Sequence, residues 1–320
     1  TSSPDKMVPH PGVTVSGLRG SMRQLSGLAE SPLKRILGSS EGFRTGHHQS
    51  FAMKPGVDRS APRKFRESVR KGEFKGQTSG SVPGFVQANF VALPREHAYE
   101  FLTFCLKNPA PCPLLAVTEP GSTAVEAVAA GADISRDIPR YVIHRDGKPR
   151  EQLYDVAEYW NKDMVGFLLG CSFSWEDKLA SVQLTPKNAQ LGVNVSMYNT
   201  NIPNHQSGPF KGNMVVSMRP YKPEDIERVA KITEAFPGAH GGPVHWGDPK
   251  EIGIDDISRP NYGDAVPIEP EEIPVFWACG VTPQSALRSA ELPIAITHAP
   301  GHMFITDIKC VSMRRFVAHR

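Results

Sequence analysis

Long apolar stretches are absent from this chain of 320 residues, and none approaches the roughly 20 residues that a membrane-spanning helix needs. No membrane span is therefore expected. Cysteine is also scarce: there are five, an odd number, and no two form a Cys-x-x-Cys pair. Disulfide frameworks are typical of short secreted chains, so this usage favours reduced thiols in a cytosolic or matrix-like compartment.

The sequence has no Gly-x-Gly-x-x-Gly pattern, the fingerprint of a dinucleotide site, and no redox cofactor is expected. A strong charge of one sign is missing too, because 36 Lys and Arg stand against 33 Asp and Glu. Residues 1–64 hold ten basic and four acidic residues, whereas residues 65–320 hold 26 and 29. By charge, nucleic-acid binding is thus unlikely for the body and possible only for the basic segment.

Residues 1–64 are predicted to be a basic extension and not a domain, because Ser, Gly, Pro and Arg are frequent and large apolar residues are few. An Arg- and Ser-rich, acid-poor composition is typical of organellar targeting segments or their remnants, which predicts a location in the mitochondrial matrix. Such a segment does not order itself. It is either a disordered tail or a segment that docks on protein partners in a larger assembly, or on a second copy of the chain.

Patterns typical of strands and helices alternate through the body, residues 65–320. Residues 95–107 and 156–168 have the apolar spacing of helices. The alternation favours an α/β fold with a largely parallel sheet flanked by helices. A hairpin turning at Asp146-Gly147 and a polar-faced strand near residue 196 interrupt it. They predict a smaller α+β second domain, inserted at about residues 120–210.

The stretch VFWACGVTPQ predicts a buried strand that runs through Cys279 into a helix capped by Thr282. A helix N-terminus at the end of a strand presents free N–H groups that bind a carboxylate or phosphate, with Thr282 and Gln284 at its mouth. Cys279 has two interpretations. It is either a nucleophile with a lowered pKa or a small buried thiol that packs the sheet.

In GCSFSWED, Ser174 is expected to cap a helix whose first turn contains Glu176, with Cys171 in the preceding corner. Glu176 is either a general acid or base tuned by burial, or a charge that complements the helix dipole.

The stretch QTSGSVPGFVQANF joins a glycine-rich loop to a strand. Thr78 and Ser79 could bind an anion, or simply form a turn. Gln87 and Asn89 share one face of the strand, and if that face is inward their amides need partners, which a polar substrate would supply.

The pairs His240 with His245 and His298 with His302 lie in Gly- and Pro-containing stretches, HGGPVHWGDP and THAPGHMFITD. Neither stretch can be the helical HxxxH motif of zinc enzymes. Three interpretations stay open: a loop-borne metal site, as in a metal-dependent hydrolase; acid–base or substrate-binding groups; and structural turns. We favour an imidazole presented to a pocket, without metal.

These loops and the Cys279 corner are expected to meet around one pocket. The strands near residues 276 and 295 would be parallel neighbours in one sheet, joined by a right-handed crossover helix, so that their carboxyl ends share an edge.

Together these segments resemble the DUF1445 family of hydro-lyases, which includes the mitochondrial D-glutamate cyclases. The resemblance covers about residues 65–310 and is carried by TSGSVPGFVQANF, FCLKNPAPCPLL, DMVGFLLGCSFSWE, FPGAHGGPVHWGDPKEIGI, PVFWACGVTPQ and ITHAPGHMFITD. It implies a two-part α/β architecture and the dehydration of D-glutamate, or a similar small carboxylate, to 5-oxo-D-proline. Family members tend to carry Arg in V-x-M-Y-R-T, where this chain has Asn199. Arginine forks hold carboxylates well, and Arg136, Arg140 and Arg219 remain as candidates.

Two functions follow as hypotheses: a hydro-lyase of the cyclase type, and an enzyme-derived structural subunit of a larger mitochondrial assembly with weakened or lost activity. For the enzyme, a histidine would take the amine proton and Glu176 would protonate the departing oxygen. The residues predicted to be catalytic are Glu176, His240, His245, Cys279 and His298. Those predicted to bind substrate are Thr78, Ser79, Gln87, Asn89, Arg136, Thr282, Gln284 and His302.

Overall fold

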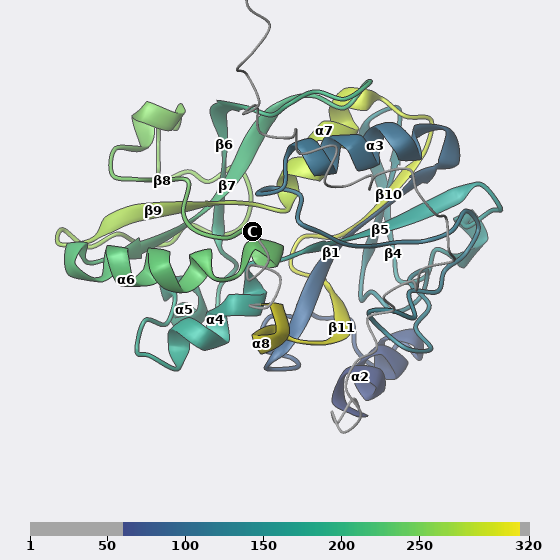
Figure 1. The fold of residues 1–320 in the computed structure, drawn as a ribbon, viewed down its shortest axis with the longest axis horizontal. Helices are drawn as coiled ribbons and strands as arrows, with labels where there is room; N and C mark the ends of the chain where they lie inside the picture. Colours follow the sequence, from purple (N-terminus) through teal and green to yellow (C-terminus); the bar gives the residue numbers. More distant parts are fainter. Residues whose placement is uncertain (1–59, 314–320) are drawn as a thin grey trace, which may run out of the picture. The chain divides into compact units, whose positions relative to one another are not determined.

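The computed structural model describes residues 60–313, which are built around two sheets (Figure 1). The larger sheet has the order β2-β5-β1-β10-β3-β4, and β11 also pairs with β1. Its strands are β1 (Phe85–Pro94), β2 (Leu114–Val117), β3 (Tyr141–Arg145), β4 (Lys148–Leu153), β5 (Met164–Gly170), β10 (Ala295–His298) and β11 (Phe304–Lys309). The second sheet has the order β6-β7-β9-β8. Its strands are β6 (Ser196–Pro203), β7 (Asn213–Tyr221), β8 (His245–Trp246) and β9 (Ile273–Ala278).

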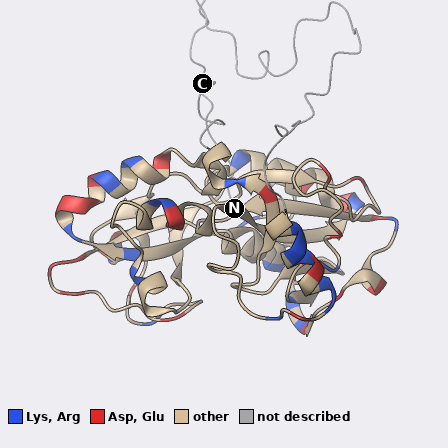
Figure 2. Cartoon of the chain, turned by 90° about the horizontal axis from the view of Figure 1, so that it is seen from below, with Lys and Arg blue, Asp and Glu red and all other residues tan. Residues whose placement is uncertain are grey.

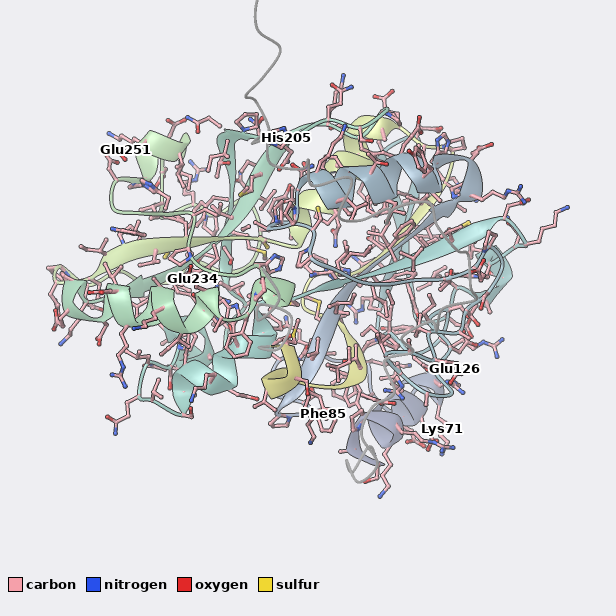
Figure 3. The ribbon with its side chains drawn as sticks, in the orientation of Figure 1. Lys71, Phe85, Glu126, His205, Glu234 and Glu251 are labelled. Carbon is pink, nitrogen blue, oxygen red and sulfur yellow. The ribbon has the colours of Figure 1, made fainter. Side chains whose placement is uncertain are left out.

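Helices cover both sheets (Figure 1). They are α2 (Ser60–Arg70), α3 (Arg95–Lys107), α4 (Phe173–Ala180), α5 (Lys187–Leu191), α6 (Pro223–Glu234), α7 (Val281–Ala290) and α8 (Cys310–Met313). Short 3₁₀ turns are η1 (Ala157–Tyr159), η2 (Pro237–Ala239) and η3 (Pro249–Ile252). Side chains fill the space between these elements (Figure 3). Among residues 60–313, no helix is long and apolar enough to span a bilayer.

The predicted α/β class is confirmed, but the predicted parallel sheet is wrong. Every strand pair in both sheets is antiparallel. The strands β9 and β10, expected to be parallel neighbours, belong to different sheets, and α7 leads from one sheet to the other. The alternation of strand and helix patterns along the sequence therefore did not predict which strands pair.

The strand β5 replaces a predicted helix. Residues 156–168 were expected to be helical, but only Ala157–Tyr159 form a helical turn, and Met164–Gly170 form a strand between β1 and β2. All seven residues of β5 are buried. A strand buried on both faces shows no alternation of apolar and polar residues, so its sequence can match helical spacing.

Other local predictions are confirmed. The helix at residues 95–107 is α3, and the hairpin β3–β4 turns at Asp146-Gly147. Both turn residues have positive φ, 50° and 70°, as a two-residue hairpin turn that matches the twist of its strands requires.

The predicted domain boundaries stay predictions. Residues 1–59 of the basic extension lie outside the described residues, and residues 60–64 begin helix α2, which continues to Arg70. Residues 120–210 contribute strands to both sheets. Lys and Arg stand among Asp and Glu over the outer helices and loops in the view of Figure 2, except on helix α2, where four basic residues stand against one Glu.

Candidate active site

The corner between β9 and α7 lies at the centre of the site. Helix α7 begins at Val281 with Gly280 as its N-cap, so the predicted Thr282 cap is wrong. The buried Thr282 hydroxyl instead accepts a hydrogen bond from the Val215 N–H at 2.9 Å and lies 3.2 Å from the Val215 carbonyl oxygen. Thr282 thus holds α7 against β7, and it does not line the pocket described below.

Asn89 of β1 packs directly on this corner. Its Nδ2 donates to the carbonyl of Gly170 at 2.8 Å, and its amide leaves no room for a Cβ at Gly280. Residue 280 must therefore be glycine for β1 and α7 to approach so closely. No described residue donates to the amide oxygen of Asn89, which leaves it as an acceptor at the pocket wall.

His240 is brought to the site by a close backbone approach. The carbonyl of Gly238 in η2 fills the space where a side chain at Gly170 would lie, which seats this loop on the end of β5. His240 itself has φ +77°, an uncommon conformation for a residue with a side chain. Its Nδ1 lies 2.8 Å from the carbonyl oxygen of Ala110, which can only accept. The proton is therefore on Nδ1, and Nε2 carries a free lone pair.

His298, at the end of β10, provides a second buried imidazole. Its Nδ1 lies 3.1 Å from the Phe90 nitrogen and 3.2 Å from the Phe90 oxygen, and the Gln284 Nε2 lies 3.4 Å from it. Burial lowers the pKa of both His240 and His298 to about 4. Both rings are therefore neutral at physiological pH.

Two thiols occupy equivalent strand-to-helix corners, Cys171 before α4 and Cys279 before α7. Burial raises the pKa of Cys171 to about 12 and that of Cys279 to about 11, although backbone hydrogen bonds from Phe173 and Val281 lower them in part. Of the two interpretations of Cys279, the raised pKa favours the small buried thiol over the nucleophile, and neither thiol is a ready nucleophile at neutral pH.

These groups line one pocket of about 380 Å³, a volume that includes the space at its open mouth. Its polar side chains are Asn89, Cys171, Ser172, Asn194, His240, Cys279 and His298. The predicted meeting of the His240 loop, the Cys279 corner and the His298 loop is confirmed. No Lys, Arg, Asp or Glu of the described residues lines it.

A second pocket, of about 290 Å³, adjoins the first through Phe173, which lines both. It contains three of the predicted residues, Ser79, Gln87 and Glu176. Thr78 is fully buried behind it and donates to the Gln87 Oε1 at 2.8 Å, while the Met303 N–H donates to the Thr78 hydroxyl at 2.9 Å. Thr78 therefore ties the glycine-rich loop both to Gln87 of β1 and to the loop after β10.

Six predicted residues line neither pocket. Thr78, Thr282 and Gln284 are described above, and the others are His245, His302 and Arg136. The His245 Nε2 lies 2.9 Å from the Asp248 oxygen at the outer edge of the second sheet, near the Glu251 that Figure 3 labels. The His302 Nδ1 lies 2.9 Å from the Pro300 oxygen, and burial lowers its pKa. Arg136 is exposed and pairs with Asp155 at 3.2 Å. Their predicted roles in the reaction stay untested.

Arg219, one of the three candidate arginines, lies behind the first pocket. It is fully buried on β7, donates to the Glu176 Oε1 at 2.8 Å and to the Ser172 Oγ at 3.1 Å, and lies 4.5 Å above the Trp175 ring. Ser172 was not predicted at all. A charged residue within the apolar strand VVSMRP was the available signal for Arg219. By contrast Asn199, where family members tend to carry Arg, is exposed on β6.

Among residues 60–313, no three His, Cys, Asp or Glu side chains are arranged to hold a metal ion. The four loop histidines do not converge, because only His240 and His298 share the pocket.

Sequence comparisons identify the family of this chain. The model of the family described as D-glutamate cyclase matches residues 165–307, a range that contains Cys171, Ser172, Arg219 and Cys279. A relative from Burkholderia multivorans named "Putative hydro-lyase" is 49% identical over 255 residues, 80% of this chain and 98% of the relative. The chain belongs to the D-glutamate cyclase family. Relatives with the same name from Rubrobacter xylanophilus and Geobacillus kaustophilus are each 51% identical, over 76% of this chain and 93% of theirs. Membership of this family supports a hydro-lyase.

Proposed function

We propose that the chain dehydrates D-glutamate, or a similar small carboxylate, to 5-oxo-D-proline. The observation that carries the proposal is a pocket in which two neutral imidazoles, His240 and His298, face the same space as two helix N-termini. In the reaction the amine nitrogen attacks the γ-carboxyl carbon. A C–N bond forms, a C–O bond breaks, and one carboxyl oxygen leaves as water.

The proton balance favours a pair of bases. The ammonium nitrogen loses two protons in becoming a lactam N–H, and the departing oxygen gains two in becoming water. Two imidazoles that each accept one proton and return it match this balance. The free Nε2 of His240 and the amide oxygen of Asn89 are acceptors suited to the amine. A bound carboxylate next to His240 would raise its pKa from about 4 and make it a stronger base.

Two helix N-termini face the same pocket. Val281 begins α7 and Phe173 begins α4, and although their N–H groups donate to the Cys279 and Cys171 thiols, the positive ends of two helix dipoles meet here. This arrangement holds an anion without placing an arginine in the pocket.

The test is incubation of the purified chain with D-glutamate, with 5-oxoproline followed by mass spectrometry. We expect turnover, and a fall in kcat of about 100-fold or more in His240→Asn and in His298→Asn, the usual range for loss of a proton-transfer group. His245→Asn is the matched control and should keep wild-type kcat. Absence of turnover above the blank between about pH 6 and 9 would refute the proposal.

The alternative of an enzyme-derived assembly subunit rests on the basic extension and on Asn199, where family members tend to carry Arg. The predicted matrix location rests on the extension. Residues 1–59 of it lie outside the described residues. We propose that the extension directs the chain to the mitochondrial matrix. A separate test compares the distribution of a tagged full chain with that of a chain starting at Ser60, by cell fractionation. Equal distribution of the two chains would contradict a targeting role for the extension.

A further inference from the structure

We propose that Ser172 is the residue through which the pocket recognises a carboxylate, and that Arg219 polarises it from behind without touching the ligand. This inference rests on the proposed function only in placing the ligand in the first pocket.

Arg219 is oriented between the two pockets. Its guanidinium is fully buried and lies 4.5 Å from the ring centre of Trp175 and 5.6 Å from that of Trp277. Its one ion pair among the described residues is with Glu176, at 2.8 Å. Glu176 lines the second pocket, whereas Ser172, which accepts from the same Nη2 at 3.1 Å, lines the first. Arg219 itself lines neither pocket, and it is joined to the first through Ser172 and to the second through Glu176.

The charge of Arg219 acts on groups of the first pocket. It contributes to the lowered pKa of His240, and it opposes the rise in the pKa of Cys279 that burial causes. At Cys171 it also opposes that rise, but the negative charge of Glu176 raises this pKa by more. The effects on His240 and Cys279 have the sign of a nearby positive charge. An anion in this pocket would therefore be stabilised by a guanidinium that it does not contact.

Ser172 is placed to transmit this effect. Its side chain is buried and its oxygen accepts from Arg219, but no described residue accepts its proton. A serine hydroxyl has one proton to donate, and accepting a charge-assisted hydrogen bond makes it a better donor. Since Ser172 lines the pocket, its proton is available to a ligand there. The chemical class that fits is a carboxylate oxygen, which can only accept.

Ser217 provides a matched control. Its hydroxyl accepts from the other guanidinium nitrogen, Nη1, at the same distance of 3.1 Å, and it is fully buried on β7. It does not line the first pocket. Removal of either hydroxyl takes one acceptor from Arg219, but only the loss of Ser172 removes a donor to the ligand.

The experiment is calorimetric titration of the full chain with glutarate, a dicarboxylate that has no amine and cannot cyclise. We expect Ser172→Ala to raise the Kd for glutarate about tenfold or more, because hydrogen bonds to charged groups have this strength. Ser172→Thr, which keeps a hydroxyl, should restore most of the affinity, and Ser217→Ala should change it by less than about twofold. Binding of the neutral diamide glutaramide, whose carbonyl oxygen accepts a weaker hydrogen bond, should fall less in Ser172→Ala than binding of glutarate does.

Equal losses in Ser172→Ala and Ser217→Ala would show that Ser172 only supports Arg219, and would overturn the inference. So would a wild-type chain that does not bind glutarate at millimolar concentration. A chain that binds glutarate with the expected pattern but does not cyclise D-glutamate would support the inference and refute the proposed function. If turnover is present, Ser172→Ala should raise KM for D-glutamate far more than it lowers kcat.

Discussion

His240 and His298 owe their neutral state to burial, and the same cause keeps Cys171 and Cys279 protonated. The pocket wall therefore has no formal charge at neutral pH, and its positive influence comes from Arg219 behind it. Such a wall costs less to desolvate than one with an exposed arginine fork. It also leaves two bases unprotonated before the substrate arrives.

The buried histidines predict a dependence of stability on pH. The pKa of His240 falls from 6.5 in the unfolded chain to about 4 in the folded chain. Its contribution to the free energy of unfolding is thus full above about pH 6.5 and is lost as the pH falls towards 4. One unit of pKa corresponds to about 1.4 kcal/mol, so the contribution is on the order of 3 kcal/mol. His298 and His144 behave alike, since the pKa of each is also lowered to about 4.

Urea denaturation at pH 7 and pH 5 measures this effect. Wild type should be less stable at pH 5, and His240→Asn should show a smaller difference between the two pH values. His245→Asn, which removes a partly exposed imidazole, should keep the wild-type difference. An unchanged pH dependence in His240→Asn would contradict the argument.

Helix α2 is held against the larger sheet by a buried ion pair. Arg66 pairs with Asp307 of β11 at 2.7 Å, and both side chains are only 2% exposed. Asp307 also accepts from the Ala130 N–H at 2.9 Å, so the carboxylate has partners on both oxygens. A second arginine of the helix, Arg70, donates two hydrogen bonds of 2.7 Å to Asp137.

Removal of one partner from a buried pair leaves the other charge without compensation. We expect Arg66→Ala to lower the free energy of unfolding by about 3–5 kcal/mol. Arg63→Ala breaks the exposed pair of the same helix with Glu67, and should cost less than about 1 kcal/mol. Urea denaturation of the two variants checks this, and equal losses would show that the Arg66 pair does not anchor the helix.

At the scale of the molecule, the two sheets share a core. One cluster of buried residues joins Val86 of β1 and Trp175 of α4 to Val229 of α6 and Trp277 of β9. The pocket lies where the two sheets meet, since β1, β10 and the end of β9 all contribute to it. We therefore expect residues 60–313 to unfold as one cooperative unit.

Urea unfolding followed by tryptophan fluorescence and by far-ultraviolet circular dichroism tests this cooperativity. Trp175 and Trp277 report the shared core, with ring centres 5.5 Å apart, whereas circular dichroism reports both sheets and all helices. The two curves should have the same midpoint. Two separated midpoints would mean that one sheet unfolds before the other.

The sequence by itself determined the features whose causes are local. The helix α3, the hairpin turn at Asp146-Gly147 and the motif blocks that carry the family resemblance depend on neighbouring residues only. Pocket residues were predicted in the same way, because local Gly and Pro mark the loop after helix α6 that presents His240 and the strand ends that present Cys279 and His298. The prediction that these residues share a pocket is confirmed, but the argument for it is wrong, since the strands before Cys279 and His298 are not parallel neighbours.

Only the tertiary structure decided strand direction, the strand β5, the neutral thiols and the position of Arg219 behind Ser172. Each of these depends on contacts between residues far apart in the chain. Strand pairing is chosen among several apolar partners, and a pKa depends on how deeply a group is buried. A local sequence pattern contains neither the strand pairing nor the depth of burial. The same residues give the same pattern whichever strands pair and however deeply a group is buried.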